Sequence, residues 1–249
     1  MVREQWTVWI AIAALCALAW VYTINLAAAM PTGSMGAMAA MPAVTDWTWI
    51  DFTTMFMMWS VMMVAMMLPS ATPMILLFAT VSRKQELPTP RWMRIGLFVG
   101  GYLVVWTAFS IIATVLNWGL HTGGYLTSVM GRVTPLIGGI ALVAAGLYQW
   151  TTLKYVCLDN CRSPVGFLTT YWRNTTGNAL EIGIRHGAFC FGCCWLLMIL
   201  LFVLGVMNLV WIVVLTVFVL LEKVIPHGRT MGRVAGVLMV GWGGWLIAT

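Results

Sequence analysis

The chain has 249 residues, of which 61% are hydrophobic and 8% are charged, and its formal net charge is +6. Soluble proteins carry about 25% charged residues, so this composition excludes an ordinary soluble domain and indicates an integral membrane protein. The positive charge reflects the basic loops described below, which are short and suited to lipid headgroups, so it needs no nucleic-acid partner.

Apolar runs of roughly 20 residues are long enough to cross a bilayer, and the sequence contains seven candidates. In chain order they are Trp6–Ala29, Asp51–Val81, Met93–Leu116, Thr134–Leu153, Ile184–Val206, Leu209–Leu221 and Met231–Ala248. We therefore predict an all-α, polytopic transmembrane bundle of about seven helices that forms a single domain over residues 1–249. The first run ends in three alanines that resemble a cleavage site, but its length favours an uncleaved signal anchor.

Basic residues concentrate in alternate loops. The amino terminus and the second, fourth and sixth loops together hold 12 of the 13 lysine and arginine residues, and the remaining one is Arg132. This asymmetry predicts a cytoplasmic amino terminus and an outside carboxyl terminus by the positive-inside rule. The expected location is the cell membrane (inner or plasma), with the lipid bilayer as the surroundings of the bundle.

Methionines concentrate in the first outer loop and in the second apolar run. The positions are Met30, Met35, Met38 and Met41 in the loop, and Met62, Met63, Met66 and Met67 among those in the run. In a helix, the spacing within the run stacks sulfur atoms on adjoining strips about one turn apart. Such a stripe is typical of a packed core, but it also suits a relay or second site for a soft metal, and both interpretations stay open.

Five of the six cysteines form two groups at the predicted cytoplasmic ends of the fourth and fifth runs. The first group is Cys157 and Cys161, and the second is Cys190, Cys193 and Cys194. Positions i, i+3 and i+4 share a helix face, so the second group points in one direction. The two groups meet if the fourth and fifth helices are neighbours.

Two further residues accompany the second cysteine group. His186 lies one turn before Cys190 on the same predicted face and is a candidate auxiliary ligand. Arg185 lies near the start of the same helix, where a cation is expected to favour thiolate over thiol. Cys16, alone in the first run, is expected to be a small apolar packing residue.

The chemistry of these side chains points to a soft metal. Cysteines on the reducing side of a membrane are more often metal ligands or redox groups than structural disulfides. Thiolate and thioether sulfur favour Cu(I), while thiolate alone also suits zinc. The sequence therefore predicts a Cu(I) site at the five cysteines, and a structural zinc–thiolate site is the alternative metal interpretation.

Other functional classes find less support in the sequence. Motifs for hydrolysis, phosphate binding or dinucleotide binding are absent. Asp51, Glu222 and Lys223 lie at the ends of the predicted helices rather than in mid-membrane, which disfavours a proton-driven transporter. A membrane thiol–disulfide oxidoreductase that exchanges electrons between the two cysteine groups is the enzymatic alternative, although its thiols would face the reducing side.

Three segments of the chain carry a resemblance to a known family. They are Trp59–Pro69, Lys154–Pro164 and His186–Met198, with continuations at Met207-Asn208-Leu209 and Glu222-Lys223. This pattern, above all the Cys-Phe-Gly-Cys-Cys-Trp element, resembles a family of predicted metal-binding integral membrane proteins of unknown function, often described as copper chaperones. The resemblance covers about residues 51–223 and implies a polytopic membrane protein with a role in metal handling.

These observations together predict a membrane protein that binds Cu(I) and either moves it inward or delivers it. A copper-dependent membrane enzyme or another membrane subunit is the conceivable partner. An enzymatic activity of the chain itself is less favoured than binding.

Overall fold

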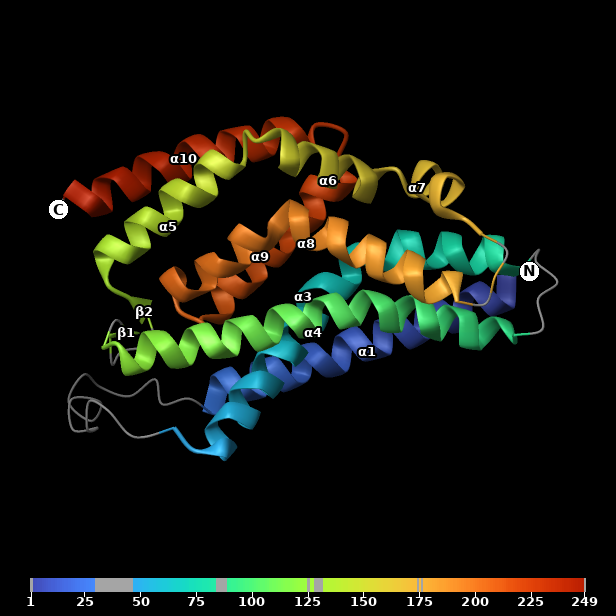
Figure 1. Ribbon diagram of the computed structural model, residues 1–249, viewed down its shortest axis with the longest axis horizontal. Helices are drawn as coiled ribbons and strands as arrows, with labels where there is room; N and C mark the ends of the chain where they lie inside the picture. The colour runs from blue at the N-terminus through green and yellow to red at the C-terminus, as the bar shows by residue number, and fades with distance from the viewer. Residues whose placement is uncertain are drawn as a thin grey trace.

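The computed structural model describes residues 2–29, 47–83, 89–124, 126–127, 132–173, 175 and 177–248. This part of the chain is α-helical apart from one β-hairpin of two-residue strands, which confirms the predicted all-α class (Figure 1). The methionines of the first outer loop, Met30, Met35, Met38 and Met41, lie outside the described residues, so their predicted role stays a prediction.

The helices divide into long and short ones. The long helices are α1 (Val2–Ala29), α3 (Trp49–Arg83), α4 (Arg91–Thr122) and α8 (Asn178–Leu204). The shorter elements are β1 (Leu126–Thr127), β2 (Arg132–Val133), α5 (Pro135–Tyr148), α6 (Thr152–Arg162), α7 (Pro164–Tyr171), α9 (Leu209–Val224) and α10 (Gly228–Ala248). Helix α8 is central because it packs against α4, α5 and α6, while α10 lies along α5 and α1 along α3. The two ends of the chain lie at opposite ends of the molecule (Figure 1).

Five of the described helices are long and apolar enough to cross a membrane: α1 over Gln5–Ala28, α3, α4, α8 and α10. Helices α5 and α6 together make a sixth candidate, but they are bent by 65° at the break between them. Helix α9 has 16 residues, or about 24 Å at 1.5 Å per residue, which is shorter than a hydrocarbon core of about 30 Å. The predicted count of seven spans is therefore not confirmed by helix length.

The predicted fourth span, Thr134–Leu153, is wrong at its carboxyl end. Helix α5 stops at Tyr148, and a new helix begins at Thr152 in a different direction. Thr151 caps the new helix, because its Oγ1 accepts a hydrogen bond from the backbone N–H of Lys154 at 3.3 Å, as Thr does at helix starts. The bend lays the polar helix α6 along α8 instead of letting it leave the bundle.

Glycines bring α4 and α8 into backbone contact. A Cβ atom at Gly183 would overlap the carbonyl oxygen of Phe98, and one at Gly187 would lie 3.1 Å from the carbonyl oxygen of Tyr102. Small residues allow helices in a membrane to approach in this way. The close crossing brings the ring of Tyr102 up to the face of α8 that carries the cysteines.

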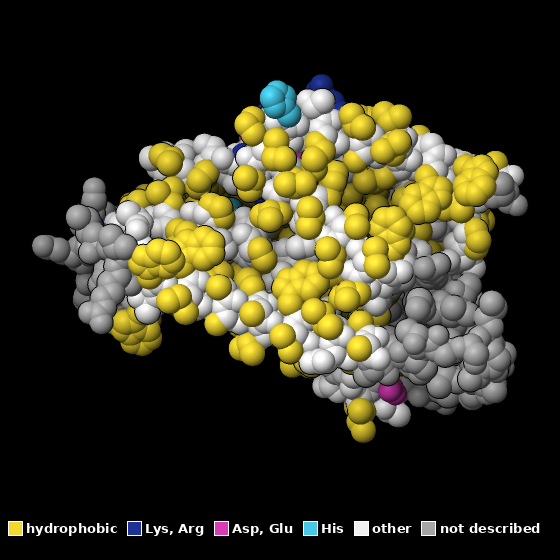
Figure 2. All heavy atoms as spheres, turned by 180° about the vertical axis from the view of Figure 1, so that it is seen from behind, with side chains coloured by type: hydrophobic (Ala, Val, Ile, Leu, Met, Phe, Trp, Pro, Cys, Tyr) yellow, Lys and Arg dark blue, Asp and Glu magenta, His cyan; other side chains and the backbone are white. Residues whose placement is uncertain are grey.

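The outer surface of the bundle is apolar. Figure 2 shows hydrophobic side chains spread over the viewed face, and large exposed ones include Ile10 on α1, Val210 on α9 and Leu238 on α10. A contiguous apolar surface of this extent would favour aggregation in water and is suited to lipid. The helix faces turned inward carry aromatic rings and methionines, with Trp59 and Trp106 among the largest buried side chains.

Candidate metal centre

The three cysteines of α8 point into the bundle. Cys190, Cys193 and Cys194 are each at most 1% exposed. The thiols of Cys193 and Cys194 donate hydrogen bonds of 3.0 and 3.1 Å to the carbonyl oxygen of Cys190, as side chains three and four positions along a helix can do. The helical spacing predicted from the sequence thus gathers three sulfur atoms on the inward side of α8.

The two cysteines of α6 lie against the same stretch of α8. The Sγ of Cys157 rests on Gly192, where an added Cβ atom would approach it to 2.6 Å. The Cys161 side chain interacts with the side chain of Cys193. The Tyr148 hydroxyl, at the end of α5, donates to the carbonyl oxygen of Gly192. The packing of α6 on α8 therefore brings the two cysteine groups together.

One methionine of α3 reaches the thiols. The Sδ of Met67 lies 3.9 Å from the Sγ of Cys194. Its backbone carbonyl oxygen also accepts a hydrogen bond of 3.0 Å from the Tyr102 hydroxyl. Met62, Met63 and Met66 are as deeply buried as Met67 and lie in the same core. Thiol and thioether sulfur from α3 and α8 consequently meet in an interior closed to solvent.

His186 lies beside the cysteines but among aromatic rings. Its imidazole packs against Phe98, Tyr102 and Phe167, with ring centroids 5.5–6.2 Å apart. Its Nδ1 atom is buried and has no hydrogen-bond partner among the described residues. The hydroxyl of Tyr102 lies between this region and the thiols, 3.2 Å from the Sγ of Cys190. The structure thus places His186 in an aromatic layer that adjoins the thiols through Tyr102.

A buried lysine that the sequence does not mark as a site residue contacts the thiol of Cys190. The Nζ of Lys223, in the last turn of α9, lies 3.0 Å from the Sγ of Cys190 and 2.9 Å from the Oγ of Ser70. The sequence correctly places Lys223 at a helix end, but that end lies inside the bundle, where Lys223 is 8% exposed. The signal available in the sequence was the pair Glu222-Lys223 directly after 13 residues that include a single polar one, Thr216.

A second buried charge pair stands next to the first. The Nζ of Lys154 on α6 lies 2.6 Å from the Oε1 of Glu222, and both side chains are nearly inaccessible to solvent. Lys154 also donates to the side-chain oxygen of Gln149. Adjacent residues of α9 therefore contact different helices: Glu222 pairs with a lysine of α6, and Lys223 contacts α3 and α8.

The expected role of Arg185 beside the thiols is wrong. Its guanidinium pairs at 2.9 Å with Glu181, one turn earlier on α8, and both side chains are exposed. The neighbour of Arg185 in sequence, His186, faces the interior, so Arg185 faces outward. The cation at the thiols is Lys223, supplied by a different helix.

The sulfur donors suit a soft metal, although the described residues do not form a preorganised metal site. Thiol and thioether sulfur are the ligands that Cu(I) prefers, and α8 turns three thiols inward, with the Sδ of Met67 3.9 Å from that of Cys194. Among the described residues, no group of three or more His, Cys, Asp or Glu side chains has its donor atoms placed to hold a metal ion. Binding would thus require these side chains to reorient.

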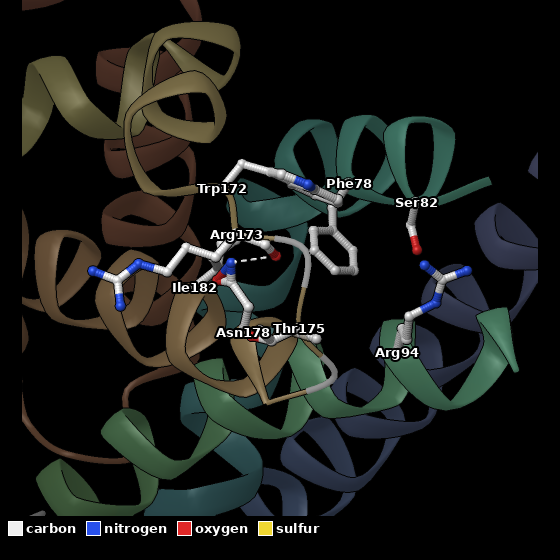
Figure 3. Close-up of a pocket in the computed structure, with 9 residues that line it drawn as sticks. Phe78, Ser82, Arg94, Trp172, Arg173, Thr175, Asn178 and Ile182 are labelled. Carbon is white, nitrogen blue, oxygen red and sulfur yellow. Dashed lines mark hydrogen bonds between the residues drawn. The ribbon is translucent and has the colours of Figure 1, made fainter. Parts of the chain in front are cut away.

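A small pocket lies at another place in the bundle. It is lined by residues of α3, α4, α8 and the segment before α8: Phe78, Ser82, Arg94, Trp172, Arg173, Thr175, Asn178, Ala179 and Ile182. The Nδ2 of Asn178 donates a hydrogen bond of 2.8 Å to the carbonyl oxygen of Arg173 and so ties this segment to the start of α8 (Figure 3). The thiols do not line this pocket.

Comparison with known proteins identified one family. A family model described as "PpoB2: Copper chaperone" matches residues 56–246, a range that includes all five clustered cysteines, the buried methionines of α3 and Lys223. Neither the curated proteins nor the solved structures gave a match.

Proposed function

The chain belongs to the PpoB2 copper chaperone family, and from this premise we propose that it binds Cu(I) within the membrane and either moves the ion inward or delivers it to a membrane partner. Copper is the cargo in this proposal rather than a resident cofactor. The partner would be a copper-dependent membrane enzyme or another membrane subunit.

The contact between Met67 and Cys194 carries the proposal. It joins a thioether from α3 to a thiol from α8 at 3.9 Å, inside a core closed to solvent. Zinc sites in proteins are built from Cys, His, Asp and Glu side chains, whereas thioether and thiolate together favour Cu(I). A mixed sulfur environment of this kind supports copper over zinc.

The roles of the individual residues follow from their order in the bundle. The thiols Cys157, Cys161, Cys190, Cys193 and Cys194 form the stronger, inner site, because thiolate binds Cu(I) more tightly than thioether does. Met62, Met63, Met66 and Met67 form the relay or second site that precedes it. His186 is an auxiliary ligand that would have to turn away from its aromatic neighbours to reach the metal.

The direction of transfer depends on the orientation of the bundle. We propose a cytoplasmic amino terminus and an outside carboxyl terminus in the cell membrane, because basic residues concentrate in the even loops. An odd number of passes fits the positions of the chain ends at opposite ends of the molecule (Figure 1). Copper would then enter from the methionine-rich outer side and reach the thiols toward the cytoplasm.

Metal binding by the purified protein tests this function. The protein is purified anaerobically in detergent, reconstituted with Cu(I), and its copper content is compared with that of a Cys190→Ser/Cys194→Ser variant. A Cys16→Ser variant is the matched control, since Cys16 is a half-buried cysteine on α1. We expect near-stoichiometric copper in the wild type and the control, and its loss in the double variant.

Other outcomes would contradict the proposal. Retention of zinc in preference to Cu(I) would instead support a structural zinc–thiolate site. A protein that binds neither metal but forms a disulfide between the two cysteine groups under mild oxidation would support the thiol oxidoreductase.

A further inference from the structure

A positive charge occupies the immediate surroundings of the proposed copper ligands. The ammonium of Lys223 contacts the Sγ of Cys190 at 3.0 Å and the Oγ of Ser70 at 2.9 Å. The charge of Lys223 also acts electrostatically on the side chains of Cys161, Cys193 and Cys194. Lys223 therefore contacts one thiol directly and influences three more through its charge.

The neighbouring carboxylate does not serve this ammonium as a direct partner. Glu222 forms its 2.6 Å ion pair with Lys154 on α6, and the Lys223 ammonium donates to one hydroxyl and one sulfur atom. A buried cation is costly unless an anion or several dipoles compensate it. The sulfur of Cys190 thus contributes, by direct contact, to the compensation of the Lys223 charge.

The same sulfur atom is a proposed ligand of copper. A Cu(I) ion bound to Cys190 would stand within a few ångströms of the Lys223 ammonium, and two like charges repel strongly in a medium of low dielectric constant. The four-carbon chain of lysine is flexible, so its ammonium can move away while the metal is bound. Ser70, on α3 and three residues from Met67, remains available to it as a hydrogen-bond partner.

We propose that Lys223 is a built-in competitor of copper: its ammonium holds Cys190 in the empty protein, is displaced when Cu(I) binds, and returns to the sulfur as the metal leaves. This inference rests on the proposed copper function and adds to it a means of release. Without a positive charge that repels the metal, five thiols would hold Cu(I) very tightly, whereas a carrier has to release the ion. Lys223 is in this sense a positioning residue, because it acts on the metal through Cys190.

Copper release from purified protein tests the inference. Cu(I)-loaded protein in detergent is mixed with an excess of a chromogenic Cu(I) chelator, and the release rate is followed optically. Lys223→Leu removes the charge without adding a ligand for copper, and Lys223→Arg keeps the charge. We expect release about tenfold slower or more in Lys223→Leu because the repulsion is lost, and a rate close to wild type in Lys223→Arg. Arg185→Gln, which removes an exposed cation of α8, should leave the rate unchanged.

The variants also separate this inference from a structural role of the lysine. Lys223→Gln removes the charge but keeps a donor for Ser70, so it should release copper as slowly as Lys223→Leu does. Release at the wild-type rate in both neutral variants would overturn the inference and leave the copper function intact. Loss of copper binding, or failure of both neutral variants to fold while Lys223→Arg folds, would also overturn it, since the charge would then be needed to build the site. A wild-type protein that binds no Cu(I) would refute the proposed function itself.

Discussion

The Sδ of Met67 and the Sγ of Cys194 lie 3.9 Å apart, although 127 residues separate them in the sequence. This contact makes Met67 the point at which the methionine-rich helix α3 reaches the thiols of α8. If copper passes between the two kinds of sulfur, it passes here.

Replacement of Met67 should therefore weaken copper binding more than replacement of another methionine of α3. We expect Met67→Leu to lower the affinity for Cu(I) about tenfold, equal to about 1.4 kcal/mol of binding free energy. Leucine conserves the volume and should cost less than about 1.5 kcal/mol of stability. Affinity is measured by competition with a Cu(I) chelator. Met57→Leu is the control because Met57 is 52% exposed on the same helix. Equal affinities of the two variants would show that Met67 is only a packing residue.

Gly192 sets the distance between α6 and α8. A Cβ atom at this position would come within 2.6 Å of the Sγ of Cys157, and an overpacked contact of this kind costs about 1–3 kcal/mol. We expect Gly192→Ala to reduce both the free energy of unfolding in detergent and the copper content. Gly100→Ala is the control, since an added Cβ atom there meets nothing within 4 Å. Copper content unchanged in Gly192→Ala would argue that Cys157 is not a ligand.

The buried pair of Lys154 and Glu222 should contribute far more to the free energy of unfolding than the exposed pair of Arg185 and Glu181. Lys154→Met leaves a carboxylate without a counter-charge in the interior, which costs about 3–5 kcal/mol. Arg185→Gln breaks a pair whose side chains are 45% and 43% exposed, and such pairs contribute about 0–1 kcal/mol. Unfolding in a denaturing detergent series measures both changes. The double variant Lys154→Met/Glu222→Met should recover most of the loss, and a failure to recover would show that packing rather than charge is responsible.

We expect α9 to cross the membrane although it is short, so that the chain as a whole makes an odd number of passes. We expect a reporter that is active only outside the cell to be active when fused after Ala248. A reporter that is active only in the cytoplasm should be active when inserted at Thr175, between α7 and α8. An inactive outside reporter after Ala248, with the cytoplasmic reporter at Thr175 still active, would mean that both positions lie on the same side and that α9 does not cross. The proposed orientation of the carboxyl terminus would then be wrong.

Part of the candidate site could be predicted because it depends on local spacing. Cys190, Cys193 and Cys194 share a face of α8 for the same reason that any residues at i, i+3 and i+4 do, and all three are buried as a group. The break after Tyr148 was not predicted, because a threonine that caps a new helix looks the same in sequence as a threonine inside an apolar run. The sequence consequently predicts one continuous span over Thr134–Leu153, whereas the structure has a bend and a second helix, α6.

Amino-acid order alone is enough to predict a largely helical protein with apolar spans, and two groups of thiols with one group on a single helix face. Composition and helical periodicity carry that information, and both are properties of neighbouring residues. The contacts of Lys223 with Cys190, 33 residues away, of Met67 with Cys194, and of Glu222 with Lys154 emerge only from the packing of the helices. Such contacts depend on which helices pack together and at what angle, and here the packing is set by the glycine-mediated approach of α4 to α8 and by the bend that turns α6 back onto α8.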